Sequence, residues 1–82
     1  MYLLIYSEHT VKQLKKLPRE IQKRIIAALE RCRIRPYPHV TKLVGSPYFR
    51  LRVGDYRIIM DIQENKLIIF LIEIGHRKNI YK

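Results

Sequence analysis

The sequence has little of what builds disulfides, membrane spans or secretion signals. One cysteine, Cys32, stands among 82 residues, so no internal disulfide can form. Cys32 falls on the apolar stripe of a predicted helix, which indicates a buried thiol and a reducing compartment. No apolar run reaches the roughly 18 residues that cross a bilayer, and the short run at residues 2–6 has no basic flank before it. We therefore expect a soluble cytoplasmic protein that contacts no membrane.

The patterns that hold metals and nucleotides are also missing. The three histidines, His9, His39 and His76, are widely separated, and Cys32 has no ligand-type residue near it. There is no glycine-rich phosphate loop and no acidic pair spaced for two-metal hydrolysis. We expect neither a metal ion nor a cofactor.

Acidic residues are scarce. Seven of them face 17 lysines and arginines, which leaves a net charge of +10 and predicts an anionic partner: a nucleic acid, an anionic membrane surface or an acidic protein. The hydrophobic content of 48% excludes disorder. No repeat or linker divides the chain, so residues 1–82 are expected to form one domain with a modest core.

Helical periodicity governs the first half of the chain. Residues 2–6 predict a strand, and Ser7 is the expected N-cap of a helix that begins at Glu8. Pro18 should end this helix and occupy the first position of the next. The second helix carries an apolar stripe at Ile21, Ile25, Ala28, Leu29 and Cys32. Together these features predict a tight helical hairpin with one apolar face.

A period of two replaces the helical pattern near residue 47. Residues 36–47 read as a connector, in which Thr41–Val44 is a candidate short strand. Strands are predicted around residues 48–53, 56–62 and 66–74, joined as an antiparallel meander. The fold class is therefore α+β: an N-terminal helical hairpin packed on a mostly antiparallel sheet of about four strands.

The clearest functional signal is the stretch YFRLRVGDYR, residues 48–57. Alternation puts Arg50 and Arg52 on one sheet face, and a two-residue turn at Gly54-Asp55 would set Arg52 directly opposite Arg57. Like charges that face each other destabilise a sheet by about 0.2 to 1 kcal/mol per pair. We therefore expect these three arginines to hold an anion, and guanidinium groups suit phosphate oxygens.

The last predicted strand should return its end to the same turn and bring His76, Arg77 and Tyr81 to the edge of the arginine patch. Such a set can bind a phosphodiester and stabilise additional negative charge on it. RNA carries its own nucleophile, the 2′-hydroxyl, so this chemistry permits a metal-free ribonuclease. The alternatives are a basic surface that only binds, with His76 a polar strand end and Tyr81 a packing anchor.

The segments KLVG, RLRVGDYR and IEIGHRKNIYK resemble the RelE toxins of the RelE/ParE superfamily, and the resemblance covers nearly the whole chain. It implies a RelE-like, microbial-RNase-like fold. It also implies a toxin of a type II toxin–antitoxin system that binds the ribosomal A site, cleaves mRNA there through 2′-hydroxyl attack and so inhibits translation. A RelB-like antitoxin would silence it in a complex of higher oligomeric state.

Carried over by position, the resemblance assigns catalytic roles to Arg50, Arg52, Arg57, Arg77 and Tyr81, and to His76, where other superfamily members carry a catalytic histidine. RelE itself has lysines at the first two positions; arginine keeps their charge but cannot transfer a proton. Tyr81 is thus the expected main acid or base, with His76 as its helper.

Further basic residues are expected to contact RNA or the ribosome: Lys12, Lys15, Lys16, Lys23, Arg24, Lys42 and Lys78. The alternative is that those on the helices form solvated faces. Two other functions stay open. One is a ParE-like toxin that inhibits DNA gyrase, and the other is a basic RNA-binding domain without catalysis.

Overall fold

The computed structural model describes residues 1–76. Its elements in chain order are β1 (Leu3–Tyr6), α1 (Glu8–Lys15), α2 (Arg19–Ile34), the 3-10 turn η1 (Tyr37–His39), β2 (Val40–Lys42), β3 (Phe49–Val53), β4 (Tyr56–Gln63), the 3-10 turn η2 (Glu64–Lys66) and β5 (Ile68–His76). Within these residues no helix is both long enough and apolar enough to cross a membrane.

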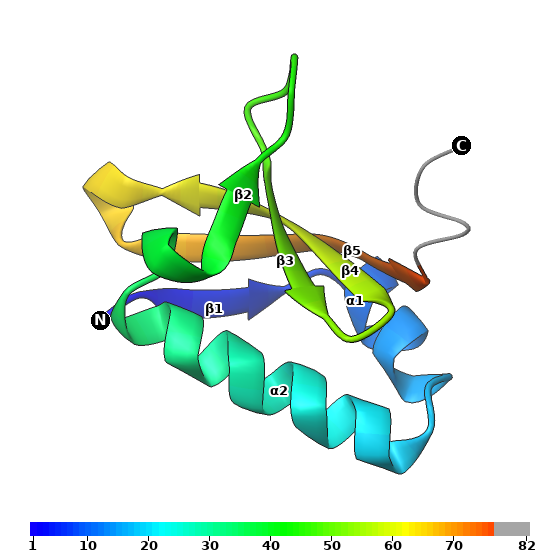
Figure 1. Cartoon of the computed structure of the whole chain (residues 1–82). Helices are drawn as coiled ribbons and strands as arrows, with labels where there is room; N and C mark the ends of the chain where they lie inside the picture. Colours follow the sequence, from blue (N-terminus) through cyan, green and yellow to red (C-terminus); the bar gives the residue numbers. More distant parts are fainter. Residues whose placement is uncertain (77–82) are drawn as a thin grey trace.

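The strands form one sheet in the order β1-β5-β4-β3-β2 (Figure 1). β1 runs parallel to β5, and every other neighbouring pair is antiparallel. The α+β prediction is confirmed, with five strands in place of about four. The additional strand is β2, the candidate short strand of the connector, whose three residues pair with β3 from Val40 to Lys42. β5 lies between β1 and β4, which explains why its sequence is apolar on both faces.

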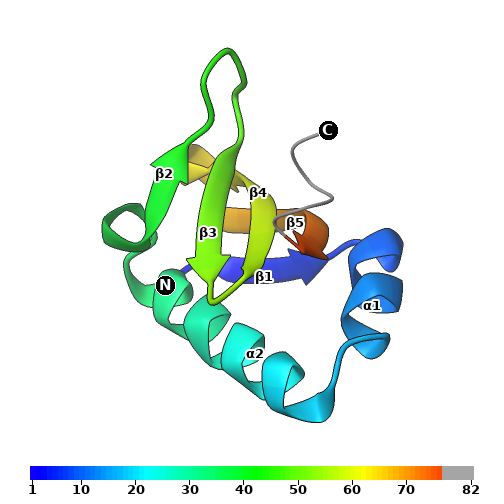
Figure 2. The same ribbon diagram turned by 45° about the vertical axis from the view of Figure 1, so that its right-hand side comes forward.

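Both helices lie on one side of the sheet, with α2 running beneath the β3–β4 hairpin (Figure 2). Four of the five residues of the predicted α2 stripe are buried, with Ile25, Leu29 and Cys32 fully enclosed, and Ile21 is partly buried. They belong to the same core cluster as sheet residues such as Ile58, Met60 and Leu71. Burial raises the pKa of the Cys32 thiol to about 11. Within residues 1–76, the opposite face of the sheet carries no α-helix (Figure 2).

The two helices start and stop close to where the sequence predicted. The Ser7 hydroxyl accepts the Thr10 N–H at 3.1 Å, which confirms Ser7 as the N-cap of α1. The prediction for Pro18 is wrong by one position: Pro18 is the N-cap of α2 and not its first helical residue. Its ψ of 146° is extended, because an N-cap residue turns the chain into the helix before helical geometry begins.

Candidate functional site

The β3–β4 hairpin holds three arginines on one face of the sheet. Gly54 opens its turn with a φ of +58°, a conformation that glycine adopts without steric cost. As predicted, Val53 pairs with Tyr56 and Arg52 with Arg57. Because side chains alternate along a strand, Arg50 lies on the same face as this arginine pair, away from the core that Leu51 and Ile58 join. We call the surface of Arg50, Arg52 and Arg57 the arginine face.

Arg57 sits differently from the other two arginines. It is only 7% exposed, whereas Arg50 is half-buried and Arg52 is exposed. Its Nη1 donates long hydrogen bonds, 3.5 Å to the Gly54 carbonyl and 3.4 Å to the Tyr56 carbonyl. Its Nε has no hydrogen-bond partner within residues 1–76. A buried cation with an unused donor is unfavourable by itself, and an oxyanion beside it would satisfy both the charge and the donor.

The end of β5 returns beside the hairpin turn, as the sequence predicted. Arg57 pairs with Gly75 and Tyr56 pairs with His76. The register between β4 and β5 shifts by one residue at Ile59/Met60, so that Ile72 is an extra residue in β5. Such a bulge reverses the side of the sheet to which the following side chains point.

Because of this bulge, His76 lies on the helix side of the sheet, the side opposite the arginine face. With unbroken alternation it would share the side of Phe70, which pairs with Asp61 and lies on the arginine side. The His76 ring instead packs edge to face against the ring of Tyr56, with centroids 5.4 Å apart. The structure therefore brings His76 to the end of the arginine face but not onto it.

A cleft of about 400 Å³ opens on the helix side of this strand end. Its walls include Gln13, Lys16 and Leu17 from the end of α1 and the segment after it, and Tyr56, Glu73 and His76 from the strands. We call it the strand-end cleft. β1 pairs with β5 only as far as Leu71, so beyond Leu71 this edge of β5 has no β1 backbone to bond with and lies next to α1. There the Gln13 Oε1 accepts the Ile74 N–H at 2.6 Å and holds α1 against β5.

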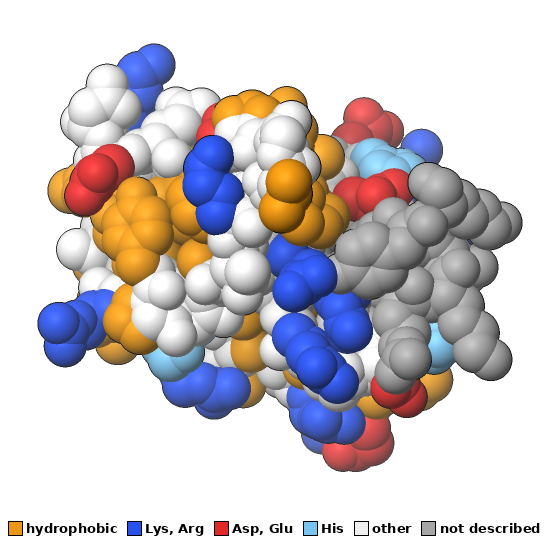
Figure 3. All heavy atoms as spheres, turned by 45° about the horizontal axis from the view of Figure 1, so that its top comes forward, with side chains coloured by type: hydrophobic (Ala, Val, Ile, Leu, Met, Phe, Trp, Pro, Cys, Tyr) orange, Lys and Arg blue, Asp and Glu red, His pale blue; other side chains and the backbone are white. Residues whose placement is uncertain are grey.

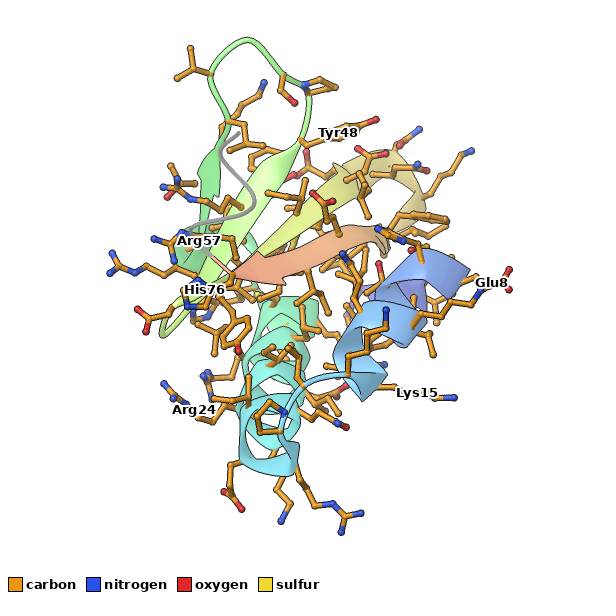
Figure 4. The ribbon with its side chains drawn as sticks, turned by 90° about the vertical axis from the view of Figure 1, so that its right-hand side faces the viewer. Glu8, Lys15, Arg24, Tyr48, Arg57 and His76 are labelled. Carbon is orange, nitrogen blue, oxygen red and sulfur yellow. The ribbon has the colours of Figure 1, made fainter. Side chains whose placement is uncertain are left out.

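Two of the predicted binding residues come close to this region. Lys16 lines the strand-end cleft. Arg24 of α2 reaches the hairpin turn, since a Cβ on Gly54 would stand 3.3 Å from Arg24 Nη2. Figure 4 shows Arg24, Arg57 and His76 along one side of the molecule and Lys15 on the other. The sequence placed Arg24 on a helix face, and only the packing of α2 beneath the hairpin brings it here.

The remaining basic residues are more scattered. Lys12 lies 3.8 Å from Glu8 along α1, and Lys42 Nζ donates to the Ser46 carbonyl at 3.0 Å. Lys23 is exposed on α2. Lys and Arg side chains nevertheless gather in one area of the surface drawn in Figure 3. The other predicted site residues, Arg77, Lys78 and Tyr81, lie outside the described residues.

Of the residues that line the strand-end cleft, sequence reasoning assigned only Lys16 and His76 to a site and missed the others, Tyr56 and Glu73 among them. Tyr56 carried a signal, since it follows the turn directly and precedes Arg57. Among residues 1–76 no group of three or more His, Cys, Asp or Glu side chains is close enough to hold a metal ion. The chemistry available here is that of fixed positive charge, two aromatic rings and a few polar side chains.

A family model described as "ParE toxin of type II toxin-antitoxin system, parDE" matches residues 4–81 of the chain. This protein belongs to the RelE/ParE family of type II toxin–antitoxin toxins. The toxin is 32% identical to "Toxin RelE3" of Methanocaldococcus jannaschii, over 95% of this chain and 93% of that one. It is 29% identical to "mRNA interferase toxin RelE" of Escherichia coli K12, over 94% of this chain and 84% of the relative.

Solved structures agree with the toxin's architecture. The isolated E. coli RelE toxin superposes with a TM-score of 0.83 at 23% identity, over 93% of this chain and 84% of that one, and so shares the fold. The RelE of the archaeal RelE–RelB complex from Pyrococcus horikoshii gives 0.84 at 26% identity, over 95% and 97% of the two chains. The RelB–RelE antitoxin–toxin complex from Methanococcus jannaschii gives 0.75 at 32% identity, over 94% of each.

Proposed function

We propose that this toxin is a ribosome-dependent endoribonuclease that cleaves mRNA in the A site without a metal ion and so inhibits translation. The observation that carries the proposal is Arg57, a buried guanidinium with an unused donor, directly opposite Arg52 on the arginine face. An RNA phosphate beside it would receive hydrogen bonds from a preformed, partly dehydrated cation. The E. coli relative that is named an mRNA interferase supports this reading.

In the proposed reaction the 2′-hydroxyl oxygen bonds to the adjacent phosphorus while its proton passes to a general base. The bond between phosphorus and the 5′-oxygen breaks as that oxygen takes up a proton, which leaves a 2′,3′-cyclic phosphate and a 5′-hydroxyl. Arg50, Arg52 and Arg57, with Arg77, would neutralise the charge that builds on the phosphorane. None of these arginines can serve as the base, because arginine does not release its proton in proteins.

Proton transfer is assigned to Tyr81 as the main group, with His76 as its helper. The position of His76 supports this order, since its ring lies on the helix side while the phosphate is proposed to sit on the arginine face. Tyrosine has an ordinary pKa near 10, and guanidinium groups beside Tyr81 in the proposed site would favour the phenolate that a base requires.

The proposed partners follow from the same assignment. The net charge of +10 suits the phosphates of ribosomal RNA, and a target on the ribosome places the toxin in the cytoplasm. The relatives solved as RelB–RelE complexes support a RelB-like antitoxin, which we propose holds the toxin in a higher oligomer. An acidic or amphipathic segment that folds on binding would complement this basic surface.

Inhibition of DNA gyrase is the second candidate, because the matching family model is described as a ParE toxin. A ParE-like action needs a gyrase-binding surface and no phosphate chemistry on the arginine face. Gyrase-dependent DNA breaks without mRNA cleavage would establish this second function. Binding to programmed ribosomes with neither product would leave a basic RNA-binding protein.

The deciding experiment is primer extension on ribosomes programmed with a defined message. The parent toxin should cut within the A-site codon, and Arg57→Ala should slow the cut by about 100-fold or more, the loss expected when one donor to a developing oxyanion is removed. Arg19→Ala is the matched control, because Arg19 is an exposed arginine at the start of α2. Equal cleavage by Arg57→Ala and the parent at saturating ribosome would show that the arginine face is not the active site.

A further inference from the structure

Apart from His76, the proposed helper in proton transfer, the residues of the strand-end cleft take no part in the phosphate chemistry proposed above. The cleft nevertheless joins the arginine face at a single strand end. Gly75, which pairs with Arg57, and His76, which pairs with Tyr56, are consecutive residues of β5. Beyond Leu71 no strand pairs with the outer side of β5 within the described residues. The two surfaces are thus separated by the width of one strand, and Gly75 adds no side chain to that border.

The side chains that line the cleft are of the kinds that bind a nucleobase. The rings of Tyr56 and His76 supply aromatic surface and Lys16 supplies a cation. Glu73 also lines the cleft, but it pairs with Ile59 on the arginine side, so its carboxylate belongs to the border between the two surfaces. A volume of about 400 Å³ lies within the range of small-ligand sites. Aromatic stacking and nearby positive charge are how proteins hold unpaired bases of single-stranded RNA.

We propose that the strand-end cleft holds one base of the mRNA next to the scissile phosphate and thereby sets the sequence preference of the cut. This rests on the proposed function, since it takes the phosphate to lie at Arg57. The backbone of the message would run over the arginine face, and one base would turn past Gly75 into the cleft. Its ring would stack on Tyr56 and meet the His76 ring at its edge, because the two rings are nearly perpendicular, with Lys16 near the next phosphate.

Glu73, at the border that the base crosses, would determine which bases are accepted. An ionised carboxylate only accepts hydrogen bonds, so it favours a base with an exocyclic amino group, which cytosine, adenine and guanine have and uracil lacks. The Glu73 side chain is 46% exposed and its Oε1 lies 4.0 Å from His9 Nε2, which leaves this carboxylate accessible to a ligand. The hydrogen bond from Ile74 to Gln13 holds the two walls together, so little ordering is required on binding.

The first test compares ring removal with ring retention at Tyr56, on ribosomes programmed with all codons and read by sequencing of the cut ends. Tyr56→Leu should slow cleavage at the preferred sites by about 5- to 100-fold, the effect of losing one base–aromatic stack. Tyr56→Phe should stay within about twofold of the parent. The matched control is Tyr37→Leu, because Tyr37 makes a similar edge-to-face contact, with Phe49 at 5.7 Å, outside the strand-end cleft. Thermal unfolding confirms that each variant is folded.

The second test changes the preference and not only the rate. Glu73→Gln adds an amide donor, so codons with uracil at the bound position should gain relative to the others by about fivefold or more. An unchanged codon profile in both Glu73→Gln and Tyr56→Leu, with normal cleavage by the parent, would overturn the cleft proposal and leave the proposed function standing.

A binding readout separates the two proposals when cleavage is absent. A message with 2-aminopurine in the A-site codon and a 2′-deoxy sugar at the attack position cannot be cut, and stacking of 2-aminopurine quenches its fluorescence. The parent and Tyr56→Phe should quench it, and Tyr56→Leu should not. Quenching without any cleavage of an ordinary message would refute the proposed function alone. Equal quenching by all three proteins, or none, would refute the cleft proposal.

Discussion

Replacing Arg57 by methionine should stabilise the toxin while it slows the proposed cleavage by about 100-fold or more. The guanidinium is 7% exposed, its Nε has no partner in the described part of the chain, and Arg52 lies directly opposite. An unsatisfied buried donor costs about 1 to 3 kcal/mol. The facing pair adds about 0.2 to 1 kcal/mol. Methionine keeps a long apolar stem in the same space, so the packing of that stem is largely retained.

We therefore expect Arg57→Met to raise the free energy of unfolding by about 1 to 3 kcal/mol. For a chain of this size that corresponds to roughly 5 to 15 °C in Tm. Urea unfolding followed by circular dichroism measures the change directly. Arg52→Met is the matched control, because it removes the same like-charge pair but takes away an exposed guanidinium. Its effect should stay below about 1 kcal/mol.

Anions should stabilise the parent but not the Arg57→Met variant. Phosphate that binds the folded parent at Arg57 stabilises it by about 1.4 kcal/mol at ten times its dissociation constant, and it should leave Arg57→Met nearly unchanged. A parent that is more stable than Arg57→Met in the absence of anions would refute the reasoning. The buried guanidinium would then be satisfied by its own protein, and the case for an oxyanion site at Arg57 would fall.

Three further predictions concern the scaffold. Gly54→Ala should lower the free energy of unfolding by about 1 to 2 kcal/mol in urea titrations, because φ is +58° and the new Cβ would stand 3.3 Å from Arg24 Nη2; no loss would mean that the turn relaxes freely. Ser7→Ala removes the N-cap bond of α1 and should cost about 1 kcal/mol, whereas Ser7→Asp should retain most of the stability. Burial raises the pKa of Cys32 to about 11, so between about pH 9 and 11 the unfolded chain loses a thiol proton that the folded chain keeps. In that range the free energy of unfolding of the parent should fall by about 1.4 kcal/mol per pH unit relative to that of Cys32→Ala. A pH-independent difference between those two proteins would contradict the last prediction.

What the sequence determined by itself was local. The alternation of Arg50 and Arg52, with a glycine opening a two-residue turn, was enough to place Arg52 opposite Arg57, because strand period and turn geometry depend only on neighbouring residues. The apolar stripe of α2 likewise predicted the buried positions, Cys32 among them. The resemblance of the tail and hairpin motifs to RelE toxins identified the family without the structure.

Only the tertiary structure decided the features that depend on distant segments. The parallel pairing of β1 with β5 could not be read from either strand alone. The extra residue at Ile72 turned His76 from the arginine side to the helix side, since one inserted residue reverses every later side chain of a strand. The burial of Arg57, the approach of Arg24 to Gly54 and the strand-end cleft all arise where helices and strands far apart in the sequence meet. Local periodicity carries no information about these tertiary contacts, because they depend on the packing of the whole chain.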